Sequence, residues 1–173
     1  FGTLKKDRKA MFTEAIEQIL AIWGNEGPYL LKGDYWNIST VETADIEIGQ
    51  GLIIKPYQKP TPPIMVACMS PFSDSVKTAA QNQWSIISAN FLQPVWVASH
   101  WNKLCEGWNA KGYPDNPSAW RVAKSIFVAD DEKTAYEYAM DPKGPYGNYY
   151  SSLMKKLIGN GRSDLFKSSS DMP

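Results

Sequence analysis

Residues 64–75, with the sequence IMVACMSPFSDS, decide the fold of this chain. They open with a continuous apolar run, Ile64 to Cys68, which is typical of a β-strand covered on both faces. A turn rich in serine follows, and a helix is predicted to begin near Ser73. A buried strand that passes through a short turn into a helix is the repeating unit of a parallel α/β sheet.

The same pattern recurs twice further along the chain. Residues 85–91 predict the next strand, and a long helix over 94–110 follows it. Residues 120–128 predict a third buried strand, and the acidic stretch 130–132 favours the start of another helix, because carboxylates stabilise the positive end of the helix dipole. A last helix is predicted over 148–158. Strands that alternate with helices in this way predict an α/β fold with a parallel sheet.

The chain before this region is organised differently. Residues 7–23 predict an amphipathic helix, and an extended pair is expected around residues 32–34. The predicted apolar stripe of the helix consists of Phe12, Ile16, Ile19, Leu20 and Trp23. Residues 57–63 hold three prolines. They therefore predict a rigid connector rather than a helix or a central strand.

Composition excludes several classes of function. Lys plus Arg and Asp plus Glu number 18 each, which argues against nucleic acid or an anionic membrane surface as the main partner. No apolar run approaches the length of about 20 residues that a membrane-spanning helix needs. With a single histidine and two separated cysteines, no zinc site is expected. We expect a cytoplasmic, metal-free protein.

The serine turn, defined as residues 69–75, is the segment with the clearest chemistry. It joins the carboxyl end of a strand to the start of a helix, which is where ligands bind in parallel α/β folds. Free backbone N–H groups and the hydroxyls of Ser70, Ser73 and Ser75 suit a phosphate. The alternative is that Ser73 or Asp74 simply caps its own helix.

Several segments, in this order, resemble the bacterial luciferase-like flavin-dependent monooxygenases. The first two are residues 22–28 (IWGNEGP) and residues 33–36 (GDYW). The third is residues 59–67 (KPTPPIMVA), which the serine turn and Ala79-Ala80 follow, and the last is residues 122–130 (VAKSIFVAD). The similarity covers roughly residues 8–167. It implies that residues 1–173 are the C-terminal portion of a single (β/α)8 TIM barrel domain, because a whole barrel needs about 250 residues. Residues 168–173 are predicted to be a mobile tail.

The resemblance implies an FMN-dependent monooxygenase that uses reduced FMN and O2 to oxidise a small apolar organic substrate, with a separate flavin reductase as partner. Met69, Ser70, Ser73 and Ser75 carry over as candidates for binding the flavin phosphate, although a longer turn than in some relatives leaves the choice among the serines open. Asn90, at the end of the next strand, would hydrogen-bond a polar edge of the ligand or else cap its strand. The family's catalytic residues belong to the N-terminal half, so none is assigned.

Two other functions share this barrel: a deazaflavin-dependent reductase and a non-catalytic structural subunit. His100 and Cys105 are interpreted as helix packing residues, and Cys68 as an inert buried thiol. Residues 144–150, GPYGNYY, predict either a gate over the barrel mouth or an ordinary loop. An incomplete barrel leaves strand edges unpaired, so we expect a homo-oligomer with weak or no turnover.

Overall fold

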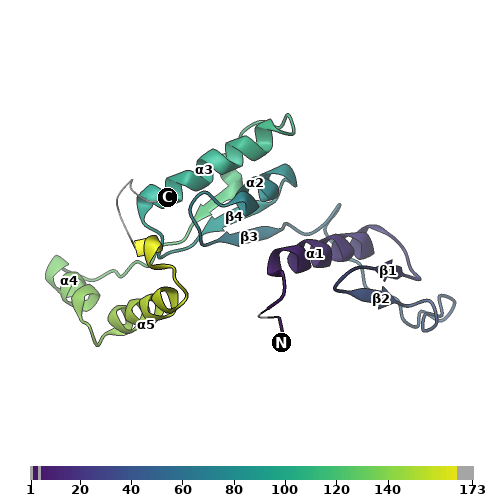
Figure 1. Cartoon of the computed structure of the whole chain (residues 1–173), viewed down its shortest axis with the longest axis horizontal. Coiled ribbons are helices and arrows are strands. Elements are labelled where there is room, and N and C mark those ends of the chain that lie inside the picture. The colour runs from purple at the N-terminus through teal and green to yellow at the C-terminus, as the bar shows by residue number, and fades with distance from the viewer. Residues whose placement is uncertain (1, 4, 167–173) are drawn as a thin grey trace. The chain divides into compact units, whose positions relative to one another are not determined.

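The computed structural model describes residues 2, 3 and 5–166, and the predicted mobile tail lies outside them. The chain divides between Pro62 and Pro63 into two compact units. The predicted connector, residues 57–63, contains this boundary and forms neither helix nor strand. The described residues form a mixed α/β fold with two small sheets and no closed barrel (Figure 1).

The first unit consists of one helix and one hairpin. Helix α1 spans Arg8–Gly24, and the strands β1, Leu30–Lys32, and β2, Asn37–Ser39, pair antiparallel. Asp7 begins α1, because its carboxylate accepts the N–H groups of residues 9 and 10 at 3.0 Å. The predicted helix and extended pair are confirmed.

The side of α1 that meets the hairpin is not the predicted apolar stripe. Gln18 and Ile22 are its buried residues, whereas two members of the predicted stripe, Phe12 and Ile19, are 52% and 40% exposed. The Glu14 carboxylate accepts the N–H groups of residues 34–36 at 2.7–3.2 Å, and Gln18 donates to the Trp36 carbonyl at 2.9 Å. Polar contacts with the hairpin turn therefore decide which face of α1 is covered.

The second unit is built on a three-stranded parallel sheet in the order β3-β4-β5. Its elements, in sequence, are β3 Met65–Cys68, α2 Asp74–Gln81, β4 Ser85–Ser88, α3 Pro94–Asn109, the short 3-10 helix Pro117–Ala119, β5 Trp120–Val122, α4 Glu132–Met140, α5 Pro145–Gly159 and the 3-10 helix Ser163–Phe166. Figure 1 shows α2 and α3 side by side. The first two predicted strand–helix units are confirmed.

The core of this unit lies between the sheet and the two helices. The residues buried there are Cys68, Val76, Ala79, Ala80, Ile86, Leu104, Trp108 and Ala119, and a second, smaller cluster consists of Leu92, Trp96, Val97 and Leu165. The helices approach closely at Gly107, where a Cβ would lie 2.5 Å from the Lys77 carbonyl oxygen. On β3, however, Met65 is 49% exposed and Ala67 is also exposed. The expectation that this strand is covered on both faces is wrong for this chain, because the described helices that pack on the sheet cover one face.

Two predictions for the last third of the chain need correction. The strand predicted over 120–128 ends at Val122, and Ile126 and Val128 are 78% and 84% exposed. The partner strand β4 ends at Ser88, and among the described residues the pairing continues beyond Val122 only through the Ala123 N–H, which donates to the Ser88 carbonyl at 3.0 Å. Residues 144–150 are not a loop, because α5 already begins at Pro145. The acidic start of α4 is confirmed, since Asp131 accepts the Thr134 N–H at 2.8 Å. None of the described helices is long and apolar enough to cross a membrane.

Candidate functional site

The carboxyl ends of the three parallel strands lie at one edge of the sheet. Cys68 pairs with Ser88, and Ser88 pairs with Val122. The ladder continues for one more residue, because the N–H groups of Ala89 and Ala123 donate to the carbonyls of Cys68 and Ser88 at 3.0 Å. The serine turn after β3 and the segments after β4 and β5 therefore leave the sheet from neighbouring positions.

A buried histidine on α3 holds the serine turn in place. His100 is fully buried, and its Nε2 lies 2.8 Å from the Ser70 carbonyl oxygen, while its Nδ1 lies 2.8 Å from Ser88 Oγ. Because a carbonyl only accepts, Nε2 carries the proton and Nδ1 accepts the Ser88 hydroxyl. Ser88 Oγ in turn accepts the Trp120 indole N–H at 2.9 Å. His100 does pack in the core as predicted, but it also fixes the turn, a role that the sequence did not indicate.

The protonation state of His100 follows from its surroundings. Burial lowers its pKa below the ordinary value of 6.5, and the hydrogen bond to the Ser70 carbonyl opposes this only in part. The imidazole is therefore neutral at neutral pH, which agrees with the donor and acceptor roles of its two nitrogens.

The neighbouring residue of α3 fixes the middle of the serine turn. Ser99 Oγ accepts the Phe72 N–H at 3.0 Å and donates to the Trp96 carbonyl at 2.6 Å. Phe72 has a φ of 51°, in the left-handed region that costs energy for a residue with a side chain. The Phe72 ring meets the Trp96 ring edge-on, with centroids 6.1 Å apart. Two adjacent residues of α3 thus hold the backbone of the turn in its shape.

The start of α2 has no side-chain cap. Ser73 is the N-cap residue, but its hydroxyl is bonded to Ser75 Oγ at 2.6 Å and caps no backbone N–H. The Asp74 carboxylate lies 3.5 Å from the Lys103 ammonium group on α3. Within the described part of the chain, the N–H groups of Asp74 and Ser75 have no hydrogen-bond acceptor. The capping interpretation is therefore wrong for these side chains. Because one of the two hydroxyls donates to the other, one hydroxyl and two amides remain as donors for a ligand.

An arginine that the sequence did not indicate completes this group. Arg162 follows α5, and its Nη1 and Nη2 atoms lie 3.4 and 3.3 Å from Ser70 Oγ. The guanidinium group carries a permanent positive charge and presents its N–H groups in the geometry that matches a phosphate. The serine turn thus carries free helical amides and hydroxyls and is contacted at Ser70 by a guanidinium, and groups of these three kinds suit a phosphate.

The other two predicted residues are placed differently. Met69 is 59% exposed. Asn90 donates to Ser125 Oγ at 3.1 Å and accepts the Tyr149 hydroxyl at 3.4 Å, and the Tyr150 hydroxyl also donates to Ser125 at 3.4 Å. Asn90 therefore joins a set of hydroxyl groups from the segment after β5 and from α5, and none of the hydrogen bonds among the described residues connects it directly to the serine turn.

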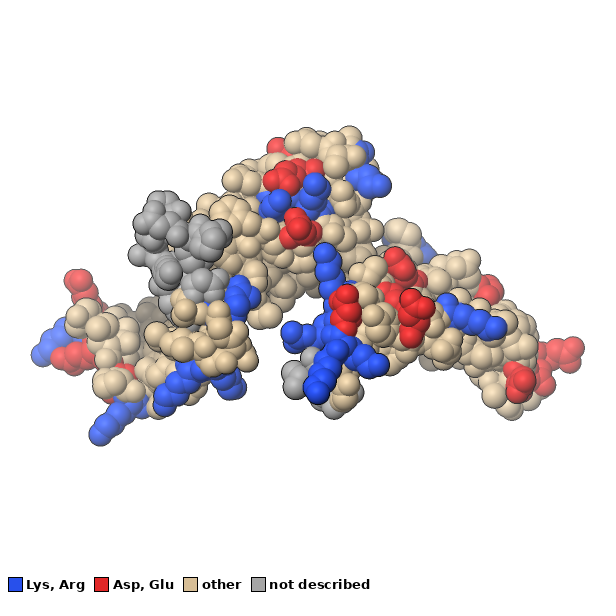
Figure 2. Space-filling model, viewed as in Figure 1, with Lys and Arg blue, Asp and Glu red and all other residues tan. Residues whose placement is uncertain are grey.

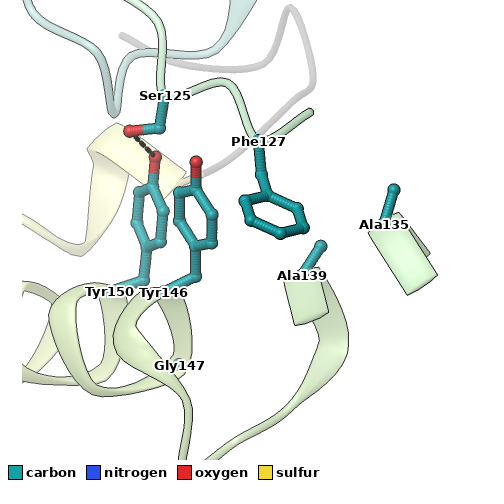
Figure 3. Close-up of a pocket in the computed structure, with 7 residues that line it drawn as sticks. All are labelled: Ser125, Phe127, Ala135, Ala139, Tyr146, Gly147 and Tyr150. Carbon is teal, nitrogen blue, oxygen red and sulfur yellow. Dashed lines mark hydrogen bonds between the residues drawn. The ribbon is translucent and has the colours of Figure 1, made fainter. Parts of the chain in front are cut away.

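A pocket with aromatic walls adjoins this set of hydroxyl groups. The tyrosine pocket, as we call it, is lined by Ser125, Phe127, Ala135, Ala139, Tyr146, Gly147 and Tyr150 and has a volume of about 530 Å³ (Figure 3). The rings of Tyr146 and Tyr150 lie one helical turn apart, are inclined by only 14° and have centroids 6.3 Å apart. Volumes between about 300 and 1,000 Å³ are typical of small-molecule sites.

Over α2 and α3, acidic and basic side chains are mixed. Figure 2 shows acidic and basic side chains next to each other over α2 and α3, where Lys103 and Lys77 both contact the Glu106 carboxylate, at 3.0 and 3.9 Å. Cys68 is buried, and burial raises its pKa to about 11. Its thiol stays protonated at neutral pH, which supports its interpretation as inert.

No protein-family model matches this sequence, and no curated protein matches it. Solved structures do. The oxygenating constituent of 3,6-diketocamphane monooxygenase, a type II Baeyer-Villiger monooxygenase from the CAM plasmid of Pseudomonas putida in complex with FMN, matches 93% of this chain with a TM-score of 0.72 and 22% sequence identity. The monooxygenase RslO1 from Streptomyces bottropensis matches 92% with a TM-score of 0.60 and 15% identity.

This chain covers 43% of the length of each of these two proteins. At such low identity the likeness concerns the fold. The chain folds like a part of these monooxygenases.

Proposed function

We propose that this chain is part of an FMN-dependent monooxygenase and that the serine turn binds the phosphate of the flavin. The observation that carries this proposal is the corner formed by the serine turn, which holds the free N–H groups of Asp74 and Ser75 and the serine hydroxyls, and which the Arg162 guanidinium contacts at Ser70. The likeness to a monooxygenase that was solved with FMN supports the choice of flavin among phosphate-bearing ligands.

Each residue has a distinct part in this proposal. The amides of Asp74 and Ser75 bind phosphate oxygens at the positive end of α2, and Arg162 supplies the opposite charge. His100 touches no ligand, but it positions the turn by holding the Ser70 carbonyl. Reduced FMN, when bound, supplies the activation of O2 that oxidises a small apolar organic substrate. The chain contributes anchoring, orientation and an aromatic wall that excludes water.

The same proposal extends to the fold. The strands β3, β4 and β5 are parallel and lie next to each other in the order of the sequence, and both connecting helices cover the same face of the sheet. A (β/α)8 barrel repeats this arrangement. We therefore place the chain in a luciferase-like TIM barrel, with the exposed face of the sheet toward the barrel interior. A separate flavin reductase and a second copy of the chain are the partners that this proposal includes.

The proposal is tested by comparing FMN with riboflavin, which lacks the phosphate. Fluorescence titration of the 173-residue chain should show that FMN binds at least about ten times more tightly, because charge-assisted hydrogen bonds contribute roughly 1.5–3 kcal/mol. Arg162→Gln should remove most of this difference and leave riboflavin unaffected. Arg121→Gln, at an exposed arginine of β5, is the matched control. Unfolding midpoints verify that both variants are folded.

Equal affinities for FMN and riboflavin would remove the basis of the proposal, as would an equal loss in the two arginine variants. Oxidation of reduced deazaflavin in place of reduced FMN would favour the reductase on the same fold.

A further inference from the structure

The tyrosine pocket shares no residue with the proposed phosphate corner. Its walls come from the segment after β5 and from α4 and α5, and none of the side chains that line it carries a charge. An anionic ligand would lose its hydration there without gaining an opposite charge. The pocket therefore selects against carboxylates and sulfonates.

The walls of the pocket are held in place by contacts among the rings. Phe127 stacks on Tyr138 with centroids 3.7 Å apart, and Tyr138 meets the Tyr146 ring edge-on at 5.6 Å. At Gly147 a Cβ would lie 2.5 Å from the Asp141 carbonyl oxygen, so only glycine allows the start of α5 to approach the end of α4 this closely. Flat rings beside the small Ala135 and Ala139 leave room for a planar ring system, which gains from stacking and edge-on contacts.

One polar group in the pocket is unused by the protein. The Tyr150 hydroxyl donates to Ser125 Oγ at 3.4 Å, whereas the Tyr146 hydroxyl has no hydrogen-bond partner among the described residues. Figure 3 shows the two hydroxyl groups pointing the same way, with that of Tyr146 beside the Tyr150–Ser125 hydrogen bond. A half-buried tyrosine usually places its hydroxyl on a partner, so a ligand acceptor at this point would complete the site.

We propose that the tyrosine pocket binds a neutral, planar aromatic compound with a carbonyl oxygen, which accepts a hydrogen bond from Tyr146. This proposal rests on the proposed function, because it takes this compound to be the organic substrate of the monooxygenase. It narrows the class of substrate from any small apolar molecule to an aromatic carbonyl compound. Tyr146 is a specificity-determining residue in this account, because its hydroxyl distinguishes a carbonyl compound from the corresponding hydrocarbon.

Three compounds of matched shape test the proposal without any flavin present. They are 2-acetylnaphthalene, 2-ethylnaphthalene, which lacks the carbonyl oxygen, and 2-naphthoate, which is charged. Their dissociation constants for the 173-residue chain are measured by ligand-observed NMR. The ketone should bind most tightly and the carboxylate most weakly.

The variants separate the hydroxyl from the shape of the pocket. Tyr146→Phe should weaken binding of the ketone roughly 3- to 10-fold, the usual contribution of one neutral hydrogen bond, and leave 2-ethylnaphthalene unchanged. Ala139→Trp, which fills the pocket from an exposed position on α4, should abolish binding of both. Tyr136→Phe, at a 65% exposed tyrosine of the same helix outside the pocket, is the control and should change neither.

The proposal is overturned if the ketone does not bind, if Ala139→Trp leaves its affinity unchanged, or if Tyr146→Phe affects ketone and hydrocarbon alike. Tight binding of 2-naphthoate would also overturn it. Because FMN is absent from these measurements, their failure is distinct from a failure of the chain to prefer FMN over riboflavin.

Discussion

Acidification tests the buried contact that holds the serine turn. His100 is the single histidine of the chain, it is fully buried, and burial lowers its pKa below 6.5. In the unfolded chain the imidazole takes up a proton with the ordinary pKa, whereas the folded protein resists protonation. The stabilising effect of the neutral ring is therefore complete above about pH 6.5 and is lost as the pH falls from there toward the lower pKa of the folded state.

The size of this effect follows from proton linkage. The free energy of unfolding should fall as the pH drops below 6.5, with a slope of at most about 1.4 kcal/mol per pH unit between this value and the lower pKa of the folded state. Urea unfolding, followed by tryptophan fluorescence at several values between about pH 7.5 and 5.5, measures this slope. His100→Asn, which cannot titrate, should be less stable at pH 7.5, because the Ser70 carbonyl and Ser88 hydroxyl lose their partner. Its stability should change little over the same pH range.

The reasoning is refuted if wild-type stability is constant, or rises, as the pH falls through 6.5. It is also refuted if His100→Asn shows the same slope, because the slope would then come from other groups. If the variant does not fold, the NMR signals of the one imidazole in the folded wild type answer the question directly. They should titrate below pH 6.5.

Three further predictions concern stability and assembly. Glu14→Gln should lower the free energy of unfolding by about 1–3 kcal/mol, because the charge-assisted hydrogen bonds to the N–H groups of residues 34–36 are weakened. Glu17→Gln, on the exposed side of α1, should change it little. Equal losses of stability in chemical denaturation would exclude a special role for the Glu14 carboxylate. Gly107→Ala should lower the free energy of unfolding by about 1–3 kcal/mol, because the new Cβ forces α2 and α3 apart. Gly159→Ala, with no atom within 4 Å of the new Cβ, should be neutral or slightly stabilising. Equal midpoints of thermal unfolding for the two variants would contradict this prediction. Light scattering should give a mass above that of a monomer, because one face of the parallel sheet is exposed, and a monodisperse monomer would disprove the expected homo-oligomer.

The sequence predicted those elements whose signals are local. The apolar run ending at Cys68 identified β3, and the carboxylate of Asp131 identified the start of α4. In each case the residues that form the element also carry the signal. The strand predicted over 120–128 failed for the opposite reason, because its length depends on where its partner β4 ends, at Ser88.

The same distinction applies to the candidate site. Ser70, Ser73 and Ser75 were recognisable because a serine-rich turn between a strand and a helix is a local pattern. Arg162 was not, because it lies 92 residues from Ser70 along the chain and only the fold brings them together. The role of His100 was hidden in the same way, since its spacing on α3 is that of an ordinary core residue.

A structure of the chain with FMN tests the central claim most directly. We predict that the flavin phosphate lies within hydrogen-bond distance of the Asp74 and Ser75 N–H groups and of the Arg162 guanidinium. A phosphate bound anywhere else on the chain, with the serine turn left without a ligand, would contradict the account.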